Sequence, residues 1–205
     1  VLGAAAAGST AASAQSTETG HWQPARHMLD DWLDEVPGKH RLVFDTTTAE
    51  GLSSAMLYAS NYFQANRTGY NLQDNDLAVV IIVRHNSTPF AYNDMIWSKY
   101  GTPISSQSGF VDPKTKQPPT ANAYNAAGGR GGTLDALAKR GVHFAVCQMA
   151  TRAFSGTIAR AVSGNTDDIY NEIVGNLLMN CHMVPAGIVA VNRAQERGYA
   201  FVHAV

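Results

Sequence analysis

The chain has 205 residues, of which 45% are hydrophobic and 15% are charged, and its formal net charge is −1. This composition is typical of a globular domain with a sizeable core rather than of a disordered chain. The 15 basic and 16 acidic residues leave no electrostatic footprint for nucleic acid, so we expect no nucleic-acid partner. No run of 18 apolar residues occurs, so a complete membrane span is not visible in the sequence.

Residues 1–15, VLGAAAAGSTAASAQ, are small and uncharged, and they end in an A-x-A pattern at Ala12-Ser13-Ala14. The segment is typical of the end of an export signal followed by its cleavage site. Its weak hydrophobicity favours a twin-arginine signal, which predicts a periplasmic protein or one associated with a membrane on the periplasmic side. A flexible Ala/Ser linker is one alternative. An uncleaved arm that contacts a membrane or a neighbouring subunit is another.

Residues 16–39 form an extension before the main domain. Within it, the stretch HMLDDWLDEV carries apolar residues at helical spacing, namely Met28, Leu29, Trp32, Leu33 and Val36. We expect a short amphipathic helix that packs outside the main core. Residues 1–39 together are a candidate contact to a membrane or to a larger complex.

Residues 40–205 alternate between strand-like and helical patterns. Strands are expected at 41–46, 76–85, 142–147, 184–191 and 199–205. Helices are expected at 49–69, 91–101, 133–141, 165–181 and 192–198. Several strands are unbroken apolar runs, which are typical of strands covered on both faces. The alternation predicts βαβ units and a mostly parallel sheet with helices on both faces.

The segment 101–132 is long, polar and rich in Gly and Pro. Loops of this length are uncommon unless they bind or cover something, so we expect a functional role for it. Its GGRGG stretch, 128–132, lacks the preceding strand and the following Lys-Ser/Thr of a phosphate-binding loop. That stretch is better explained as a hinge or a subunit contact.

In an open parallel sheet the working site lies at the carboxyl ends of the strands. This rule directs attention to three strand ends, namely Arg84-His85-Asn86-Ser87, Cys147-Gln148-Met149 and Val191-Asn192. The second of these ends carries a thiol where a helix is expected to begin.

These ends, taken in order, resemble the DsrE/DsrF-type sulfur-relay family over about residues 40–205. The resemblance is carried by GVHFAVCQMA, by VVIIVRHNSTPFAYND and by MVPAGIVAVNRAQERGYAFVHAV, which holds Gln195, Gly198 and Tyr199 at its closing turn. It implies a three-layer α/β/α sandwich around a five-stranded parallel sheet and a homo-oligomer, either a trimer or a hexamer. It also implies that Cys147 carries persulfide sulfur. The long 101–132 segment and the first 40 residues depart from the compact family pattern.

Cys147 has three interpretations. At the start of a helix, free N–H groups and the positive end of the helix dipole stabilise a thiolate, which attacks sulfane sulfur or a disulfide. Arg152 and Arg160 are candidates to add positive charge there. A free cysteine is also often only a small buried side chain. The third interpretation is a disulfide with Cys181, the one other cysteine, which requires Cα atoms within about 7 Å.

We expect the pocket around Cys147 to include His85, Asn86, Asn93 and Gln148. A histidine and amides near one end of a sheet can bind a polar ligand or orient a base. The alternative is that His85 and Asn86 satisfy loop backbone groups and that Asn93 faces solvent. No H-x₃-H or C-x₂-C spacing occurs, so we expect no metal and no cofactor.

Two functions follow from these features. The first is an exported DsrE-like protein with a sulfur-transfer or thiol-redox role through Cys147. The second is a non-catalytic scaffold or accessory subunit of an oligomeric or membrane-associated assembly, attached through residues 1–39. No G-x-S-x-G motif occurs, so hydrolase chemistry is unsupported.

Overall fold

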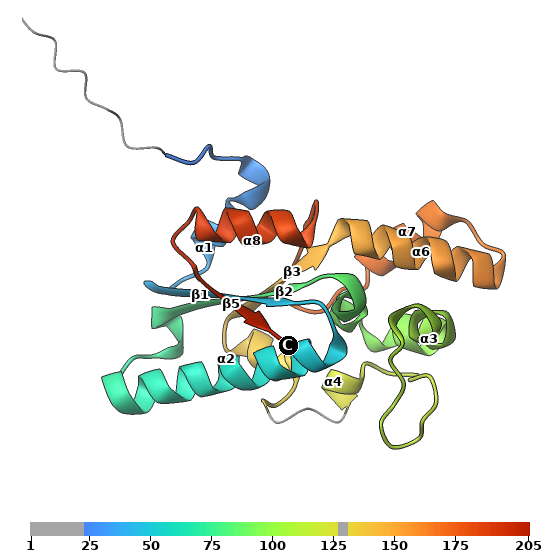
Figure 1. Ribbon diagram of the computed structural model, residues 1–205, viewed down its shortest axis with the longest axis horizontal. Helices are drawn as coiled ribbons and strands as arrows, with labels where there is room; N and C mark the ends of the chain where they lie inside the picture. The colour runs from blue at the N-terminus through green and yellow to red at the C-terminus, as the bar shows by residue number, and fades with distance from the viewer. Residues whose placement is uncertain (1–22, 127–130) are drawn as a thin grey trace, which may run out of the picture.

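Five parallel strands form one sheet at the centre of the computed structural model, which describes residues 23–126 and 131–205. The strand order is β4-β3-β2-β1-β5, and every neighbouring pair is parallel. The strands are β1 (His40–Thr46), β2 (Leu77–Val83), β3 (Val142–Cys147), β4 (Cys181–Val184) and β5 (Ala200–Ala204). Helices cover both faces, so the expected three-layer α/β/α sandwich is confirmed (Figure 1). The export-signal segment 1–15 and most of the GGRGG stretch lie outside the described residues.

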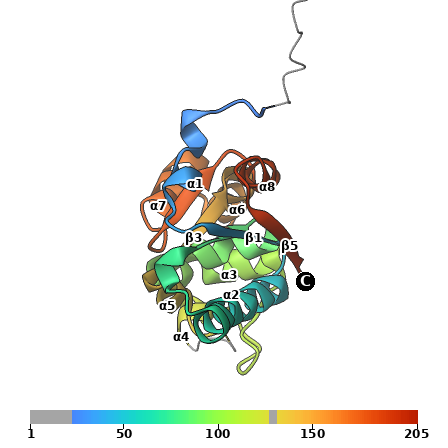
Figure 2. The ribbon, with the colours of Figure 1, turned by 90° about the vertical axis from the view of Figure 1, so that its left-hand side faces the viewer.

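Helices connect the strands and form the two outer layers. The longer ones are α2 (Ala49–Tyr70), α3 (Asp94–Ser108), α6 (Gln148–Val162), α7 (Thr166–Val174) and α8 (Gly187–Gln195). The short ones are α1 (Trp32–Glu35), α4 (Ala123–Ala126), α5 (Leu134–Lys139) and the 3₁₀ turns η1 (Met28–Asp30), η2 (Asp74–Asp76) and η3 (His85–Ala91). Helices α1 and α8 lie on one side of the sheet, whereas α2 and α4 lie on the other (Figures 1 and 2). No helix of the described ranges is both long and apolar enough to cross a bilayer.

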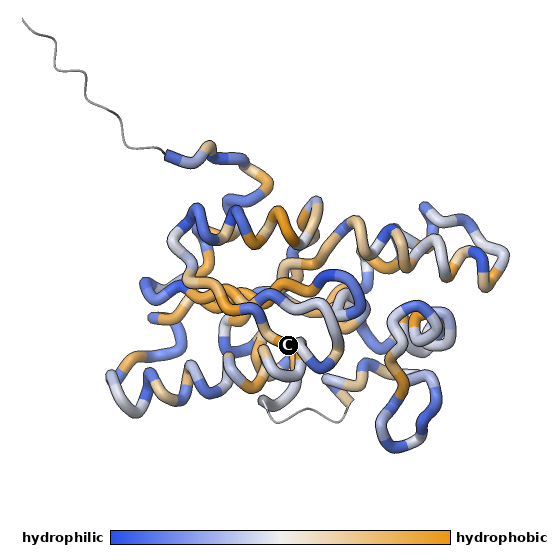
Figure 3. The backbone as a smooth tube through the Cα atoms, viewed as in Figure 1, coloured by the Kyte–Doolittle hydropathy of each residue, from blue (hydrophilic) through white to orange (hydrophobic). Residues whose placement is uncertain are grey.

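The two faces of the sheet bury separate apolar clusters, because successive side chains of a strand point to opposite faces. Phe44 and Ile81 pack in the cluster that contains residues of α2, α3 and α6. Val43 and Ile82 pack in the cluster that contains residues of α1 and α8. All seven residues of β2 are buried, as its continuous apolar run predicts. The strands are accordingly among the most hydrophobic parts of the chain (Figure 3).

The strand predicted at 184–191 is wrong. The fourth strand is β4, which ends at Val184, and most of the apolar run belongs to helix α8. Ala190, Val191 and Ala194 are buried at helical spacing against the sheet, whereas Ile188 is exposed. The periodicity of a short apolar run does not distinguish a helix from a strand. The prediction therefore depended on the length of the run, which is typical of a strand.

The helix predicted at 91–101 is also wrong at its end. Helix α3 continues past Gly101 to Ser108, with a departure from helical backbone angles at Tyr100. Gly101 does not end the helix; it permits a close crossing, because a Cβ atom there would lie 1.9 Å from the Pro119 carbonyl oxygen. The irregular segment before α4 is therefore shorter than the predicted one, and its backbone packs directly on α3.

The expectation that the N-terminal extension packs outside the main core is wrong for helix α1. Leu33 and Val36 are each 1% exposed and belong to the cluster on the α8 face of the sheet. The Tyr199 hydroxyl donates to the Leu33 carbonyl at 2.7 Å, which ties α1 to the start of β5. Met28 and Leu29, one turn earlier, are 90% and 76% exposed. The extension therefore completes one layer of the sandwich.

Candidate functional site

Cys147 is the last residue of β3 and the N-cap of α6, as the sequence predicts. Its Sγ accepts a hydrogen bond from the Ala150 N–H at 3.4 Å. The Thr151 hydroxyl donates to the Cys147 carbonyl at 3.0 Å, and the Tyr92 hydroxyl lies 3.2 Å from that Thr151 oxygen. These bonds fix the first turn of α6, so the thiol is held where the helix presents free N–H groups.

A cavity of about 270 Å³ opens at this end of the sheet. Its walls come from the ends of β2 and β3 and from the starts of α6 and α8: Arg84, His85, Cys147, Met149, Ala150, Ala153, Ala186, Gly187 and Ile188. This is the edge where open parallel sheets place their sites. Cys147 is only 7% exposed, yet it borders space that a small molecule can enter.

A row of polar side chains crosses the sheet beside this cavity. Val83 of β2 lies opposite Val146 of β3, so the next residues, Arg84 and Cys147, are also neighbours. Asp45 of β1 lies opposite His203 of β5. Arg84 Nε and Nη2 donate to the two carboxylate oxygens of Asp45 at 2.7 and 2.8 Å. His203 Nδ1 lies 3.2 Å from Asp45 Oδ2. Side chains from four adjacent strands thus meet on the α8 face of the sheet.

Arg84 is the cation of this site. The hydrogen bond that Arg84 donates to Asp45 raises the pKa of Arg84 against the opposing effect of burial, and a Cys147 thiolate adds to the rise. The side chain of Arg84 is 18% exposed and that of Asp45 is 4% exposed, so the pair lies largely away from bulk water. Nε and Nη2 bind Asp45, which leaves Nη1 without a protein acceptor among the described residues. A fixed positive charge therefore lies beside the thiol.

Helix α8 begins directly over Arg84. A Cβ atom on Gly187 would lie 2.6 Å from Arg84 Cβ and 2.8 Å from Arg84 Cδ, so only glycine allows this approach. The N-cap residue, Ala186, has no side chain that accepts a hydrogen bond from the first turn. The positive end of α8 therefore adds to the guanidinium charge at the cavity wall.

The structure brings together only part of the predicted pocket. His85 borders the cavity with Cys147, and its backbone adopts the left-handed region at φ 52°. Asn93 instead caps α3, because its Oδ1 accepts hydrogen bonds from Met95 and Ile96 N–H. Asn86 and Gln148 are likewise outside the cavity wall. Asn86 is exposed, and its backbone N–H donates to the Thr47 carbonyl.

The positive charges predicted from Arg152 and Arg160 lie elsewhere. Arg152 pairs with Asp167, and its guanidinium stacks on the ring of Tyr170. Arg160 donates to the Thr157 hydroxyl within α6. The sequence placed Arg84 at a strand end but assigned it no role, and its partner Asp45 was missed because it lies 39 residues away.

The Cys147–Cys181 disulfide is wrong for this fold. Cys181 starts β4 opposite Phe144, whereas Cys147 ends β3 opposite Val184. Three residues of a parallel strand separate the two positions by about 10 Å, beyond the reach of a disulfide. Both thiols are free, and burial raises the pKa of Cys181 to about 12. Cys181 therefore stays protonated and packs as a small side chain against the core.

A second polar cluster lies on β3 and on the edge strand β4. His143 Nδ1 and His182 Nε2, on β3 and β4, are 2.8 Å apart, and the Trp32 ring stacks on His182 at 4.0 Å. Burial lowers the pKa of His143, and burial together with His143 lowers the pKa of His182 to about 4. In the described part of the chain, no three His, Cys, Asp or Glu residues are arranged to hold a metal ion.

Comparisons with known proteins identify no family for this chain. No family model matches it, and no curated protein matches it. A solved structure described as a protein of unknown function, MTH1491 from Methanobacterium thermoautotrophicum, is 16% identical and covers 80% of this chain and 99% of its own, with a TM-score of 0.43. The assignment of function therefore depends on the chemistry of the site.

Proposed function

We propose that this protein is DsrE-like and that Cys147 transfers sulfur, or exchanges with a disulfide, on a small substrate. The observation that carries the proposal is the position of the thiol, which borders an open cavity beside the Arg84–Asp45 pair. The thiolate is the nucleophilic form of cysteine, and the Cys147 sulfur lies at a helix N-terminus and shares the cavity wall with the Arg84 guanidinium. The cysteine at a strand end is also the feature on which the family resemblance depends.

The sulfur-transfer step balances without an external oxidant or reductant. The Cys147 thiolate attacks the outer sulfur of a persulfide donor, R–S–SH, and forms a new S–S bond. The S–S bond of the donor breaks, and the donor leaves as the thiolate R–S⁻, which takes a proton from water. Cys147 then carries the persulfide. In the disulfide variant of this chemistry, the same attack on R–S–S–R gives a mixed disulfide and R–S⁻.

The cavity also limits the substrate. Its volume of about 270 Å³ suits a compact molecule, and most of its wall is apolar. Arg84 and the start of α8 line the cavity and are the positive groups available to the anionic head group of a substrate. We therefore expect a low-molecular-weight donor whose leaving thiolate or carboxylate lies next to Arg84.

Thiol labelling tests the nucleophile. We expect iodoacetamide to modify the folded protein at one site near neutral pH, and Cys147→Ser to abolish the reaction. Cys181→Ser is the matched control, because it removes the second thiol, which lies outside the cavity wall, and leaves the cavity intact. Incubation with glutathione persulfide should add one sulfur atom to Cys147, as detected by mass spectrometry of the intact protein and its peptides. A Cys147 that reacts no faster than Cys181 would contradict the proposal.

The exposed start of the extension favours a second function, that of a scaffold or accessory subunit. Met28 and Leu29 are apolar, exposed and joined to a helix that is part of the core. In this proposal, residues before α1 contact a membrane or another subunit while the sandwich serves as the framework. Deletion of residues 1–29 removes Met28 and Leu29 and leaves α1 in place. It should change the oligomer mass in light scattering or the co-sedimentation with vesicles; unchanged values for both would reject this function.

A further inference from the structure

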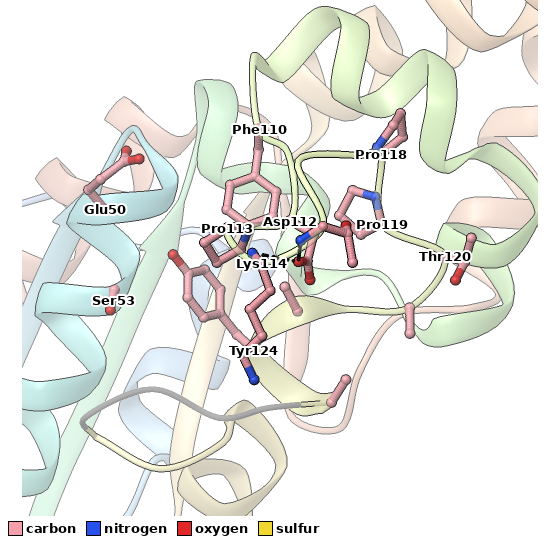
Figure 4. A pocket seen from close by; sticks show the side chains of 14 residues that line it. Glu50, Ser53, Phe110, Asp112, Pro113, Lys114, Pro118, Pro119, Thr120 and Tyr124 are labelled. Carbon is pink, nitrogen blue, oxygen red and sulfur yellow. Dashed lines mark hydrogen bonds between the residues drawn. The ribbon is translucent and has the colours of Figure 1, made fainter.

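A second cavity, of about 670 Å³, is larger than the cavity beside Cys147. Its walls are the start of α2, the loop between α3 and α4, and α4 itself (Figure 4). Helix α2 covers the opposite face of the sheet from α8, so the two cavities are separate. A volume of this size suits a drug-sized molecule.

The loop that forms one wall is held in place by buried polar contacts. Asn122 is fully buried, and its Nδ2 donates to the carbonyls of Phe90 at 2.7 Å and Tyr92 at 2.9 Å. The Asn122 N–H donates to Asp94 Oδ1 at 2.8 Å. Earlier in the loop, Pro119 packs against Gly101 of α3. The cavity is therefore formed before any ligand binds, so binding does not have to order the loop.

Two aromatic and three proline side chains are among the residues that line the wall. Phe110 and Tyr124 face the cavity with ring centroids 6.2 Å apart, and the buried Phe90 supports both, at 5.0 and 4.7 Å. Figure 4 shows Pro113, Pro118 and Pro119 around the same space. Flat, rigid and apolar surfaces of this kind bind an aromatic or hydrocarbon body at small entropic cost.

Hydrogen-bond acceptors gather at the corner formed by α2. The Tyr124 hydroxyl donates to the Ala49 carbonyl at 2.6 Å, which leaves the phenol oxygen as an acceptor. Burial, and then the charge of Glu50, raise the pKa of Tyr124 to about 12, so the phenol stays neutral. Glu50 lies in the first turn of α2, and it has no ion-pair partner among the described residues.

The charges of the wall favour a cation. Backbone N–H groups of Thr115 and Lys114 lower the pKa of Asp112, which is therefore ionised. Glu50 and Asp112 carry negative charge and Lys114 carries positive charge, so the ionised side chains of the wall sum to a negative value. Lys114 and Glu50 are both exposed, and Glu50 is close enough for its charge to act on the Tyr124 phenol at the α2 corner.

We propose that this cavity binds an arylalkylamine. The ammonium group pairs with Glu50 and donates to the Tyr124 oxygen, and the aromatic body packs on Phe110, Tyr124 and the prolines. Charge-assisted hydrogen bonds fix one end of the ligand, while apolar contact and a cation–π component supply the rest of the affinity. This binding does not depend on the thiol chemistry at Cys147.

Isothermal titration with 4-phenylbutylamine tests the site, with 4-phenylbutyrate as the probe of opposite charge. We expect saturable binding of the amine only. Glu50→Gln should raise its Kd about tenfold, because one charge-assisted hydrogen bond is lost. Asp168→Asn is the matched control, since Asp168 is an exposed acid in the first turn of α7, away from the cavity, and it should leave Kd unchanged.

Two further variants test the direction of the charge effect and its independence. Lys114→Gln should lower the Kd of the amine, because it removes a like charge from the wall. Cys147→Ser should leave the Kd of the amine unchanged. This result is expected whether or not thiol labelling shows that Cys147 is reactive. Tyr124→Phe keeps the ring and removes the acceptor, so it should also weaken binding. It serves as the test if Glu50→Gln is poorly folded. Absence of amine binding, equal binding of the butyrate, or an unchanged Kd in both Glu50→Gln and Tyr124→Phe would overturn the proposal.

Discussion

Arg84 and Asp45 form two parallel hydrogen bonds of 2.7 and 2.8 Å between adjacent strands of the sheet. The pair is nearly buried, so it loses hydration that the mutual attraction only partly offsets. A buried pair of this kind is weak support for stability, but it fixes the guanidinium in one orientation beside Cys147. We therefore expect the pair to matter more for the thiol than for folding alone.

Arg84→Lys should slow the alkylation of Cys147. Lysine keeps the positive charge but cannot make the two parallel bonds to Asp45, so the charge moves away from the thiol. We expect the second-order rate constant with iodoacetamide at neutral pH to fall about three- to tenfold. An unchanged rate across the pH range, with the fold intact by circular dichroism, would show that Arg84 does not act on the thiol.

Asp45→Asn should lower stability as well as reactivity. The substitution leaves the Arg84 charge without its carboxylate partner in a largely buried place. We expect the free energy of unfolding in urea to fall by about 3 kcal/mol. His203→Gln is the comparison, because it removes the outer partner of Asp45 and leaves the Arg84 bonds in place. Equal losses of unfolding free energy in the two variants would mean that the bonds to Arg84 are not the main contribution of Asp45 to stability.

Gly187→Ala should displace Arg84. The new Cβ atom would lie 2.6 Å from Arg84 Cβ, so either α8 or the arginine side chain must shift. We expect a loss of about 1–3 kcal/mol in the free energy of unfolding, together with slower alkylation of Cys147. Gly156→Ala in α6 is the matched control, since its Cβ meets nothing closer than Arg160 Nη1 at 3.6 Å. That substitution should be neutral or stabilising by about 0.5–1 kcal/mol.

Leu33→Ala should show that the N-terminal extension belongs to the core. Leu33 is fully buried on the α8 face of the sheet, so its truncation should cost about 3 kcal/mol in urea unfolding. Leu29→Ala removes the same atoms from a residue that is 76% exposed, and it should change stability by less than about 0.5 kcal/mol. Similar effects of the two substitutions would place α1 outside the core after all.

Stability should fall in mild acid because of His182. Its pKa in the folded state is about 4, below the ordinary value of 6.5, so the unfolded chain binds protons first as pH falls. The contribution of the neutral ring is complete above about pH 6.5 and is lost as pH drops toward 4. We expect this loss to reach about 1–2 kcal/mol after allowance for the partial exposure of the ring.

His182→Phe isolates this effect. The variant keeps an aromatic ring under Trp32 and removes the titrating group, so its melting temperature should fall less between pH 7 and pH 4.5 than that of the wild type. His40→Gln, at the exposed start of β1, should keep the wild-type slope. Parallel curves for the wild type and His182→Phe would contradict this prediction.

The architecture followed from local patterns. The unbroken apolar run of β2 and the capped helices α2 and α5 lie close to their predicted bounds, because burial on both faces and helix capping are properties of neighbouring residues. The junction of β3 and α6 at Cys147 is local in the same sense. The predictions failed where a local pattern had two solutions, as in the apolar run of α8 and at Gly101 of α3.

By itself, the sequence determined the sandwich and the place of one thiol at a strand end. Only the tertiary structure decided what surrounds that thiol, since strand order and register bring Asp45 to Arg84 across 39 residues and to His203 across 158. Register also sets the two cysteines at opposite ends of neighbouring strands. The periodicity of a sequence indicates which residues are buried, but it does not indicate which strands are neighbours. Contacts between side chains of different strands depend on which strands are neighbours and on their register.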